Sequence, residues 1–251
     1  IKLGDSIERE ITVGFIDIRN FTTLSENADP REIFDSLNRI FSHTAPQIRE
    51  YNGFVDKFIG DAAMTLFPEK PDDALNACLH IQKMVRRLNH GRETSGLPKF
   101  GMGMGINTGK VIMGTVGEEK RMDTTVISDA VNLASRLQDM TKTFGSWIII
   151  SDYTLKKLRS QRTLKIRWLG RVKVKGKEEP VSVYEVFESE HTEIIKLKLS
   201  TKEDFEKGVE HYTEEAFSQA AHYFSAVLEK NPGDQAAIHY LNETNYRLAS
   251  K

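Results

Sequence analysis

Segments typical of β-strands alternate with segments typical of amphipathic helices along the first 187 residues of the chain. Residues 10–18 predict a strand, and its apolar run from Ile11 to Ile18 is of the kind found in strands that are buried on both faces. Residues 29–51 and 72–90 instead repeat their apolar side chains at helical spacing. This alternation predicts a mixed sheet covered by helices, in either an α/β or an α+β fold.

Glycines mark a predicted turn and two further predicted strands. Gly60-Asp61 lies between two short apolar runs and is a common pair in hairpin turns. We predict strands over residues 100–107 and 110–117, and glycines alternate with methionines in the first of them. That alternation indicates a strand that another backbone approaches closely. It does not match a Walker phosphate loop, because no Ser or Thr follows the Gly-Lys pair at the required spacing.

The third quarter of the chain continues the same pattern. We predict a helix over residues 128–144 with Asp129 as its cap, then a strand at 147–151 and an extended ribbon over 166–187. Cys78 falls at helical spacing with apolar neighbours, which predicts a small buried side chain. As the only cysteine, it excludes an intrachain disulfide and a cysteine-based zinc site.

The composition changes after residue 200. Residues 200–251 carry nine acidic and five basic side chains in a helical pattern that is interrupted at Pro232. Gly208, Ala220, Phe224 and Pro232 have spacings that resemble one tetratricopeptide repeat, and a plain two-helix extension is the alternative. One repeat cannot bury its own apolar face, so we expect it to pack on the first domain or on a protein partner. The predicted domains are residues 1–190 and 200–251.

Charge and hydropathy exclude several classes of protein. The net charge of −1 does not favour nucleic-acid binding. The ten basic residues within 153–177 offer no tryptophan or phenylalanine for base stacking besides Trp168. No apolar run approaches the roughly 18–20 residues that cross a bilayer, and no signal peptide is visible. Because the chain begins with Ile, we expect a fragment of a longer protein, with any membrane attachment in a segment outside it.

Two aspartates at predicted strand ends are candidate metal ligands. Asp17 lies one residue from the end of the buried run and lacks an evident partner, although a buried charge is costly unless it is paired or holds a metal. Asp61 lies at the hairpin turn, and two adjacent carboxylates repel unless a cation bridges them. Magnesium commonly takes one or two carboxylates with substrate phosphates. Phe21 and Thr22 lead towards a helix whose backbone N–H groups could hold a phosphate. Taken singly, each aspartate also suits a turn or cap.

Basic and amide side chains form two further patterns. Asn132 and Arg136 are four residues apart and therefore share one helix face, and the guanidinium fork suits phosphate. Lys173, Lys175 and Lys177 alternate along one side of a predicted strand. A solvent-facing helix surface and an edge strand protected by lysines are the simpler interpretations of these patterns.

Together these segments resemble class III nucleotidyl cyclase catalytic domains, and the chain looks like a bacterial adenylyl cyclase. The resemblance runs from about residue 8 to residue 187. It implies an α+β, ferredoxin-like fold (an α/β sandwich) with a mixed, mostly antiparallel sheet covered by helices, followed here by a small all-α C-terminal extension. Five ordered motifs carry it: FIDIRNFT, FVDKFIGDA, GINTGKVIMGTVG, RMDTTVISDAVNLASR and VKGKEEPVSVYEV.

The resemblance also implies roles for single residues at the reacting end of the nucleotide. Asp17 and Asp61 match the two aspartates that bind two Mg²⁺ or Mn²⁺ ions, and the carbonyl of Ile18 would join the coordination shell. Asn132 matches the asparagine that orients the ribose. Arg136 matches the arginine that stabilises the transition state at the α-phosphate.

Three other matched positions concern the terminal phosphates and the base. Lys175 matches the lysine that holds the terminal phosphates, while Lys57 and Thr125 match the two purine-reading positions. A Lys with Thr or Asp is the adenylyl pattern, and guanylyl cyclases carry Glu and Cys. Lys57 can donate to adenine N1, whereas guanine N1 carries a hydrogen. An unpaired buried donor costs about 1–3 kcal/mol, so the resemblance implies ATP as substrate.

The resemblance further implies a cytoplasmic homodimer with two shared sites, because metal aspartates and nucleotide-binding groups come from opposite protomers. It predicts formation of cyclic AMP and pyrophosphate as the output of a signalling protein. A guanylyl cyclase and an inactive nucleotide-binding regulatory domain are the alternatives. Three positions depart from the family pattern without touching a matched catalytic position: Asn20, Thr124 and Ser128.

Overall fold

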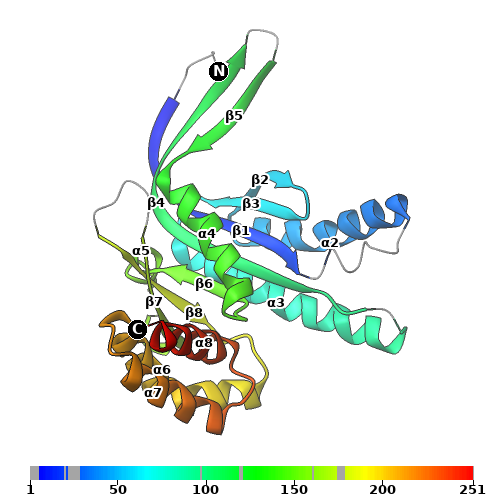
Figure 1. Ribbon diagram of the computed structural model, residues 1–251. Helices are drawn as coiled ribbons and strands as arrows, with labels where there is room; N and C mark the ends of the chain where they lie inside the picture. Colours follow the sequence, from blue (N-terminus) through cyan, green and yellow to red (C-terminus); the bar gives the residue numbers. More distant parts are fainter. Residues whose placement is uncertain are drawn as a thin grey trace.

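The computed structural model describes residues 6–19, 21, 29–96, 98–118, 121–159, 161–173 and 179–250 (Figure 1). Its strands form one eight-stranded sheet in the order β2-β3-β1-β4-β6-β8-β7, with β5 paired to β4 outside this path. All pairings are antiparallel except that of β4 with β6. The strands are β1 (Ser6–Arg19), β2 (Phe54–Ile59), β3 (Ala62–Phe67), β4 (Gly101–Glu118), β5 (Arg121–Ile127), β6 (Ile148–Ser151), β7 (Ile166–Val172) and β8 (Val181–Val186). The α+β, mostly antiparallel architecture implied by the sequence is therefore confirmed.

Helices cover the sheet on both faces. Even-numbered residues of β1, such as Ile16 and Ile18, join a core with α2 and α3. Odd-numbered residues, such as Ile11 and Val13, face α4, as the two-residue period of a strand requires. The helices are α2 (Pro30–Glu50), α3 (Pro71–Thr94), α4 (Asp129–Thr143), α5 (Asp152–Leu155), α6 (Thr192–Thr213), α7 (Phe217–Lys230) and α8 (Gln235–Ala249). None of the helices in the described ranges has the length and apolar character needed to cross a membrane.

Several local predictions from the sequence are confirmed. The β2–β3 hairpin turns at Gly60, which adopts a left-handed φ of 62°. Helix α2 continues through Pro46. Cys78 is buried in α3, and this burial raises the pKa of its thiol to about 12, as expected of an inert side chain.

The region between β4 and α4 differs from the prediction. Residues 101–107 and 110–117 belong to one continuous strand, β4, because it pairs with β1 from Gly101 to Gly114. Residues 121–127 form β5, a strand that the sequence analysis did not assign. Figure 1 shows β5 and the second half of β4 extending as an arm away from the body of the protein.

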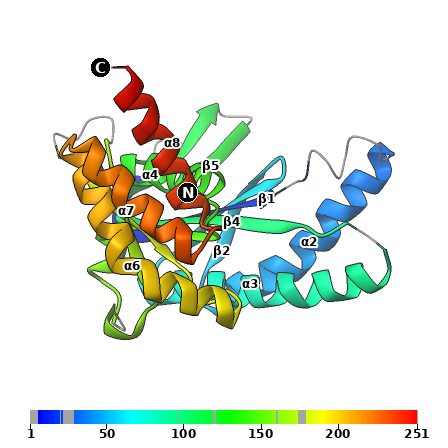
Figure 2. The ribbon, with the colours of Figure 1, turned by 60° about the horizontal axis from the view of Figure 1, so that its bottom comes forward.

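The C-terminal helices pack on the rest of the chain. In Figure 2, α6 and α7 lie side by side. Phe205 of α6, Phe224 of α7 and Tyr240 of α8 share one core with Leu137 and Phe144 from the α4 region. The expectation that this extension packs on the first domain is confirmed, while its identity as a tetratricopeptide repeat stays a prediction.

Candidate active site

The structure brings the two candidate metal aspartates to the same edge of the sheet. Asp17 lies opposite Ala62 in the β1–β3 pair, so it is next to the turn that carries Asp61. The backbone N–H of Ile18 donates to the carbonyl oxygen of Asp61 at 3.2 Å. Antiparallel pairing of β1 with β3 therefore joins two residues that are far apart in the sequence.

Asp17 is buried but not alone. Its side chain is 7% exposed and points to the α4 face of the sheet. Its Oδ2 accepts a hydrogen bond from Gln138 Nε2 at 3.1 Å and pairs with Lys142 Nζ at 2.6 Å. The expectation that Asp17 lacks a partner is therefore wrong, because the charge of Lys142 compensates the buried carboxylate.

The arrangement fits a divalent cation. Lys142 is 56% exposed, so its ammonium can leave Asp17 and is a stand-in for a cation at the carboxylate. Asp61 has no hydrogen bond or ion pair to its carboxylate within the described residues. That same part of the chain holds no cluster of three or more His, Cys, Asp or Glu side chains. A metal bound by Asp17 and Asp61 would therefore need further oxygens from phosphate, backbone or water.

Helix α4 begins at a different cap from the one predicted. Ser128, not Asp129, is the N-cap, and its Oγ accepts from the N–H of Ala130 at 2.9 Å. The same hydroxyl donates to the carbonyl of Lys110 at 2.5 Å. The serine that departs from the family pattern thus fixes the start of α4 against β4, while Asp129 lies in the first turn.

Asn132 and Arg136 lie on the exposed surface of α4. Arg136 Nη1 donates to the carbonyl of Lys173 at 2.5 Å, at the end of β7. The candidate arginine is therefore held next to the chain that leads to Lys175, although Lys175 and Thr22 themselves lie outside the described residues. Phe21 is partly buried and packs against the core around β1.

Asp17 and Arg136 face different sides of α4. Gln138 points at Asp17, and Arg136 precedes Gln138 by two residues, which is a rotation of about 200° around a helix axis. Asn132 precedes Gln138 by six residues, a rotation equivalent to about 240°. Within one chain, α4 therefore directs Gln138 and Lys142 towards Asp17 and directs Asn132 and Arg136 away from it.

The two candidate purine-reading residues lie on separate strands. Lys57 is on edge strand β2, directly after a bulge, and its Nζ pairs with Asp56 at 3.2 Å. Thr125 is on β5, opposite Gly114. No hydrogen bond or ion pair joins Lys57 to Thr125 in the described ranges.

Three residues that the sequence analysis did not single out also shape this site. Gln138 and Lys142 hold Asp17 from α4, and their four-residue spacing was the available signal. Arg19 donates from Nη2 to the carbonyl of Thr141 at 2.5 Å, which ties the end of β1 to the end of α4. These contacts fix strand β1 and helix α4 relative to each other.

Close approach of α4 to β4 depends on Gly105. A Cβ atom at this position would lie 2.2 Å from the backbone nitrogen of Gln138 and 2.4 Å from the carbonyl oxygen of Ala134. We predict that Gly105→Val destabilises the protein by about 3 kcal/mol or more, because a backbone cannot yield as a side chain does. Denaturant unfolding measures this loss. Gly91→Ala is the matched control, since a Cβ there meets nothing within 4 Å, and equal effects of the two substitutions would contradict the prediction.

Comparison with known proteins identifies the family of this chain. Residues 6–187 match the family model described as the adenylate and guanylate cyclase catalytic domain. The chain belongs to this family. It is 42% identical over 192 residues, or 74% of its length, to an adenylate cyclase of Anabaena cylindrica. It is 37% identical over 246 residues, or 96% of its length, to the terminal-differentiation specific adenylate cyclase of Dictyostelium discoideum.

The solved structures of cyclases that resemble this chain include both base specificities. The adenylyl cyclase CyaB from P. aeruginosa has a TM-score of 0.64 at 33% identity and covers 74% of this chain and 98% of its own. The guanylyl cyclase Cya2 has a TM-score of 0.61 at 33% identity and covers 72% of this chain and 93% of its own. The chain spans 38% of the length of the Anabaena relative and 12% of the Dictyostelium relative. Base choice therefore has to be argued from individual residues of this nucleotidyl cyclase domain.

Proposed function

We propose that this cyclase domain converts ATP to 3′,5′-cyclic AMP and pyrophosphate, in shared sites of a homodimer. The observation that carries the proposal is the pairing that sets Asp17 beside the Asp61 turn, with Arg136 on the far side of α4. Two carboxylates at one sheet edge suit a metal–triphosphate complex. An exposed arginine suits a phosphate brought by another chain.

Residues of this chain would position ATP for an in-line displacement. Asp17 and Asp61, with the backbone of Ile18, would hold two Mg²⁺ or Mn²⁺ ions. When bound, these ions supply a more acidic ribose 3′-hydroxyl and charge compensation for the triphosphate. Asn132 orients the ribose so that the 3′-hydroxyl releases its proton to solvent and a bond forms from the 3′-oxygen to the α-phosphorus, while the bond from that phosphorus to the pyrophosphate oxygen breaks.

Positive side chains would compensate the negative charge on the phosphates during this step. Arg136 meets negative charge that grows on the α-phosphate only in the transition state, so it lowers the barrier more than it strengthens binding. Lys175 holds the terminal phosphates, which leave as pyrophosphate. Phe21 and Thr22 belong to the segment that would approach the phosphates through backbone N–H groups.

The need for a second copy follows from helix geometry and exposed apolar surface. One chain cannot aim Asp17 and Arg136 at the same triphosphate, because α4 presents its opposite sides to them. Apolar side chains that a partner would cover are also exposed on the arm and the β2 edge. These are Ile112 and Ile127 on the arm, Ile7 on the start of β1 that pairs with it, and Phe58 and Ile59 on β2. Both observations support two equivalent sites across a two-fold axis.

Product analysis tests the proposed reaction. We expect chromatography to show cyclic AMP and pyrophosphate from ATP with Mg²⁺ or Mn²⁺, and none with EDTA. Arg136→Ala should lower kcat by about 100-fold or more with a smaller change in KM. Asp139→Asn is the matched control on the exposed surface of α4 and should retain activity. ATP binding without any product from the wild type would instead indicate a regulatory nucleotide-binding domain.

Exchange of the two purine-reading residues tests the base choice. Lys57→Glu together with Thr125→Cys should lower the ratio of cyclic AMP to cyclic GMP by roughly tenfold or more, because the donor to adenine N1 becomes an acceptor for guanine N1–H. The measurement is kcat/KM for ATP and for GTP in the wild type and the double variant. An unchanged ratio would contradict the assignment of Lys57 and Thr125.

A further inference from the structure

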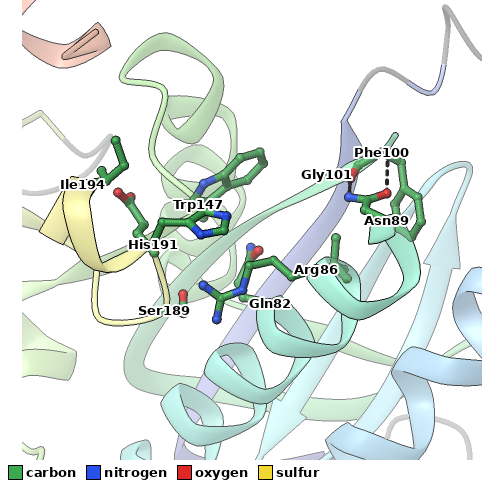
Figure 3. Close-up of a pocket in the computed structure, with 11 residues that line it drawn as sticks. Gln82, Arg86, Asn89, Phe100, Gly101, Trp147, Ser189, His191 and Ile194 are labelled. Carbon is green, nitrogen blue, oxygen red and sulfur yellow. Dashed lines mark hydrogen bonds between the residues drawn. The ribbon is translucent and has the colours of Figure 1, made fainter. Parts of the chain in front are cut away.

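A cavity of about 170 Å³ lies between α3 and the segment that enters α6, apart from the residues of the candidate active site (Figure 3). Its walls are largely apolar and aromatic. Val85 comes from α3, Phe100 and Trp147 directly precede β4 and β6, and Ile194 comes from the first turn of α6. A cavity of about 150 Å³ with such walls can hold a benzene ring, so one aromatic ring fits here.

Two polar side chains of this cavity have unused hydrogen-bonding capacity. Ser189 is 5% exposed, and its Oγ is buried without a hydrogen-bond partner. Arg86 lines the same cavity and has no ion pair or hydrogen bond to any described residue. In Figure 3 its guanidinium reaches towards Ser189 and His191. A buried hydroxyl without a partner costs stability, so a bound acceptor would recover that loss.

Charge at the cavity favours an anion. Helix α6 begins here, and its N-cap, His191, makes no side-chain capping bond to the first-turn N–H groups. These N–H groups and the helix dipole attract negative charge. The acidic residues nearby are already paired, Glu190 with Lys198 at 2.8 Å and Glu193 with Lys196 at 2.9 Å. Arg86 is therefore left as the uncompensated charge of this site.

We propose that this cavity binds a small carboxylic acid with an aromatic body. The carboxylate accepts hydrogen bonds from the Arg86 guanidinium and the Ser189 hydroxyl, since a guanidinium fork matches a carboxylate. The ring packs against Trp147 and Phe100, where aromatic contacts add to apolar burial.

The position of Trp147 connects this cavity to strand β1, which carries Asp17. The guanidinium of Arg19 lies 4.5 Å from the centre of the Trp147 ring. Arg19 also bonds the carbonyls of Thr141 and Ser146, at either side of the end of α4. A ligand that shifts Trp147 would therefore also shift Arg19. The contacts of Arg19 join β1, which carries Asp17, to the end of α4.

Tryptophan fluorescence tests the binding site without any measurement of cyclase activity. The chain has two tryptophans, so Trp168→Phe leaves Trp147 as the only reporter. Titration with benzoate should change its emission along a saturable curve, with a Kd of about 1 mM or tighter. Benzamide, the neutral isostere, should bind at least about tenfold more weakly. The shift in Tm of the wild-type protein with benzoate gives the same comparison with both tryptophans in place.

Two arginines that are adjacent in α3 provide the matched variants. Arg86→Gln should weaken benzoate binding by about tenfold or more, whereas Arg87→Gln, exposed and outside the cavity, should leave it unchanged. A linear fluorescence response, equal binding of benzamide, or equal effects of the two variants would each overturn the proposal. The link to catalysis rests on the proposed function, and an unchanged rate of cyclic AMP formation in saturating benzoate would overturn that link alone.

Discussion

Two inactive variants are expected to regain activity when they are mixed. Asp17→Asn removes a proposed metal ligand and Arg136→Ala removes the proposed transition-state donor, so each homodimer should lose about 100-fold or more of its rate. After subunit exchange, half of the dimers are mixed, and each mixed dimer has one intact site. Cyclic AMP formation should therefore return to about one quarter of the wild-type rate. The measurement is the rate per chain before and after exchange.

The dilution behaviour of the wild type completes this prediction. Activity per chain should fall at concentrations below the dimer Kd, because one α4 helix cannot present Arg136 to the Asp17 of its own chain. The control is a mixture of Asp139→Asn with Asp17→Asn. Its activity should not rise on exchange, because the Asp139→Asn chains already form intact sites with one another. Full activity of a monomer at nanomolar protein would falsify the shared-site account, as would mixed dimers that stay inactive.

The second large effect is expected at a buried ionic cluster beneath the C-terminal helices. Arg167 is 1% exposed and pairs with Glu185 and, through Nη1 at 2.6 Å, with Asp234. Lys198 pairs with Glu185 at 3.0 Å. We predict that Arg167→Met destabilises the chain by about 3–5 kcal/mol, because it leaves buried carboxylates without compensation. For a chain of this size, the Tm should fall by roughly 10 °C.

The same cluster predicts how stability depends on pH. Burial of Glu185 opposes its charge, but Arg167 and Lys198 outweigh burial and lower its pKa from 4.5 to about 2. Its contribution is therefore complete above pH 4.5 and is lost as the pH falls towards 2. In Arg167→Met the pKa of Glu185 should rise towards its unfolded value, so the loss of stability between pH 4.5 and 2 should be smaller than in the wild type. Unfolding in denaturant from pH 3 to 7 measures both effects, and Lys196→Met, which breaks an exposed pair, is the control. Parallel pH profiles of the wild type and Arg167→Met would contradict this account.

The sequence predicted those parts of the fold that local patterns determine. The apolar run of β1, the turn at Gly60 and the amphipathic pattern of α2 each specify their own element, and the structure has all three. The glycine–methionine alternation also predicted close approach, which Gly105 makes to α4. Strand β5 was not assigned, because residues 121–127 become extended through pairing with β4 rather than through a period-two apolar pattern.

Features that depend on tertiary contacts could not be predicted in the same way. The ion pair between Asp17 and Lys142 joins residues on different elements, so the residues near Asp17 in the sequence do not predict it. The capping role of Ser128 depends equally on its bond to Lys110 of β4. Helical spacing places Gln138 and Arg136 on opposite sides of α4, but only the contact of Gln138 with Asp17 shows which side faces the candidate metal ligand.

We propose above all that this chain makes cyclic AMP and selects ATP through Lys57 and Thr125. The most direct test is a single reaction that contains equal ATP and GTP with Mg²⁺, with both cyclic products quantified by chromatography beside an Asp17→Asn control. We expect cyclic AMP to exceed cyclic GMP by about tenfold or more, and the control to form neither product. Equal amounts of the two products, or an excess of cyclic GMP, would contradict it.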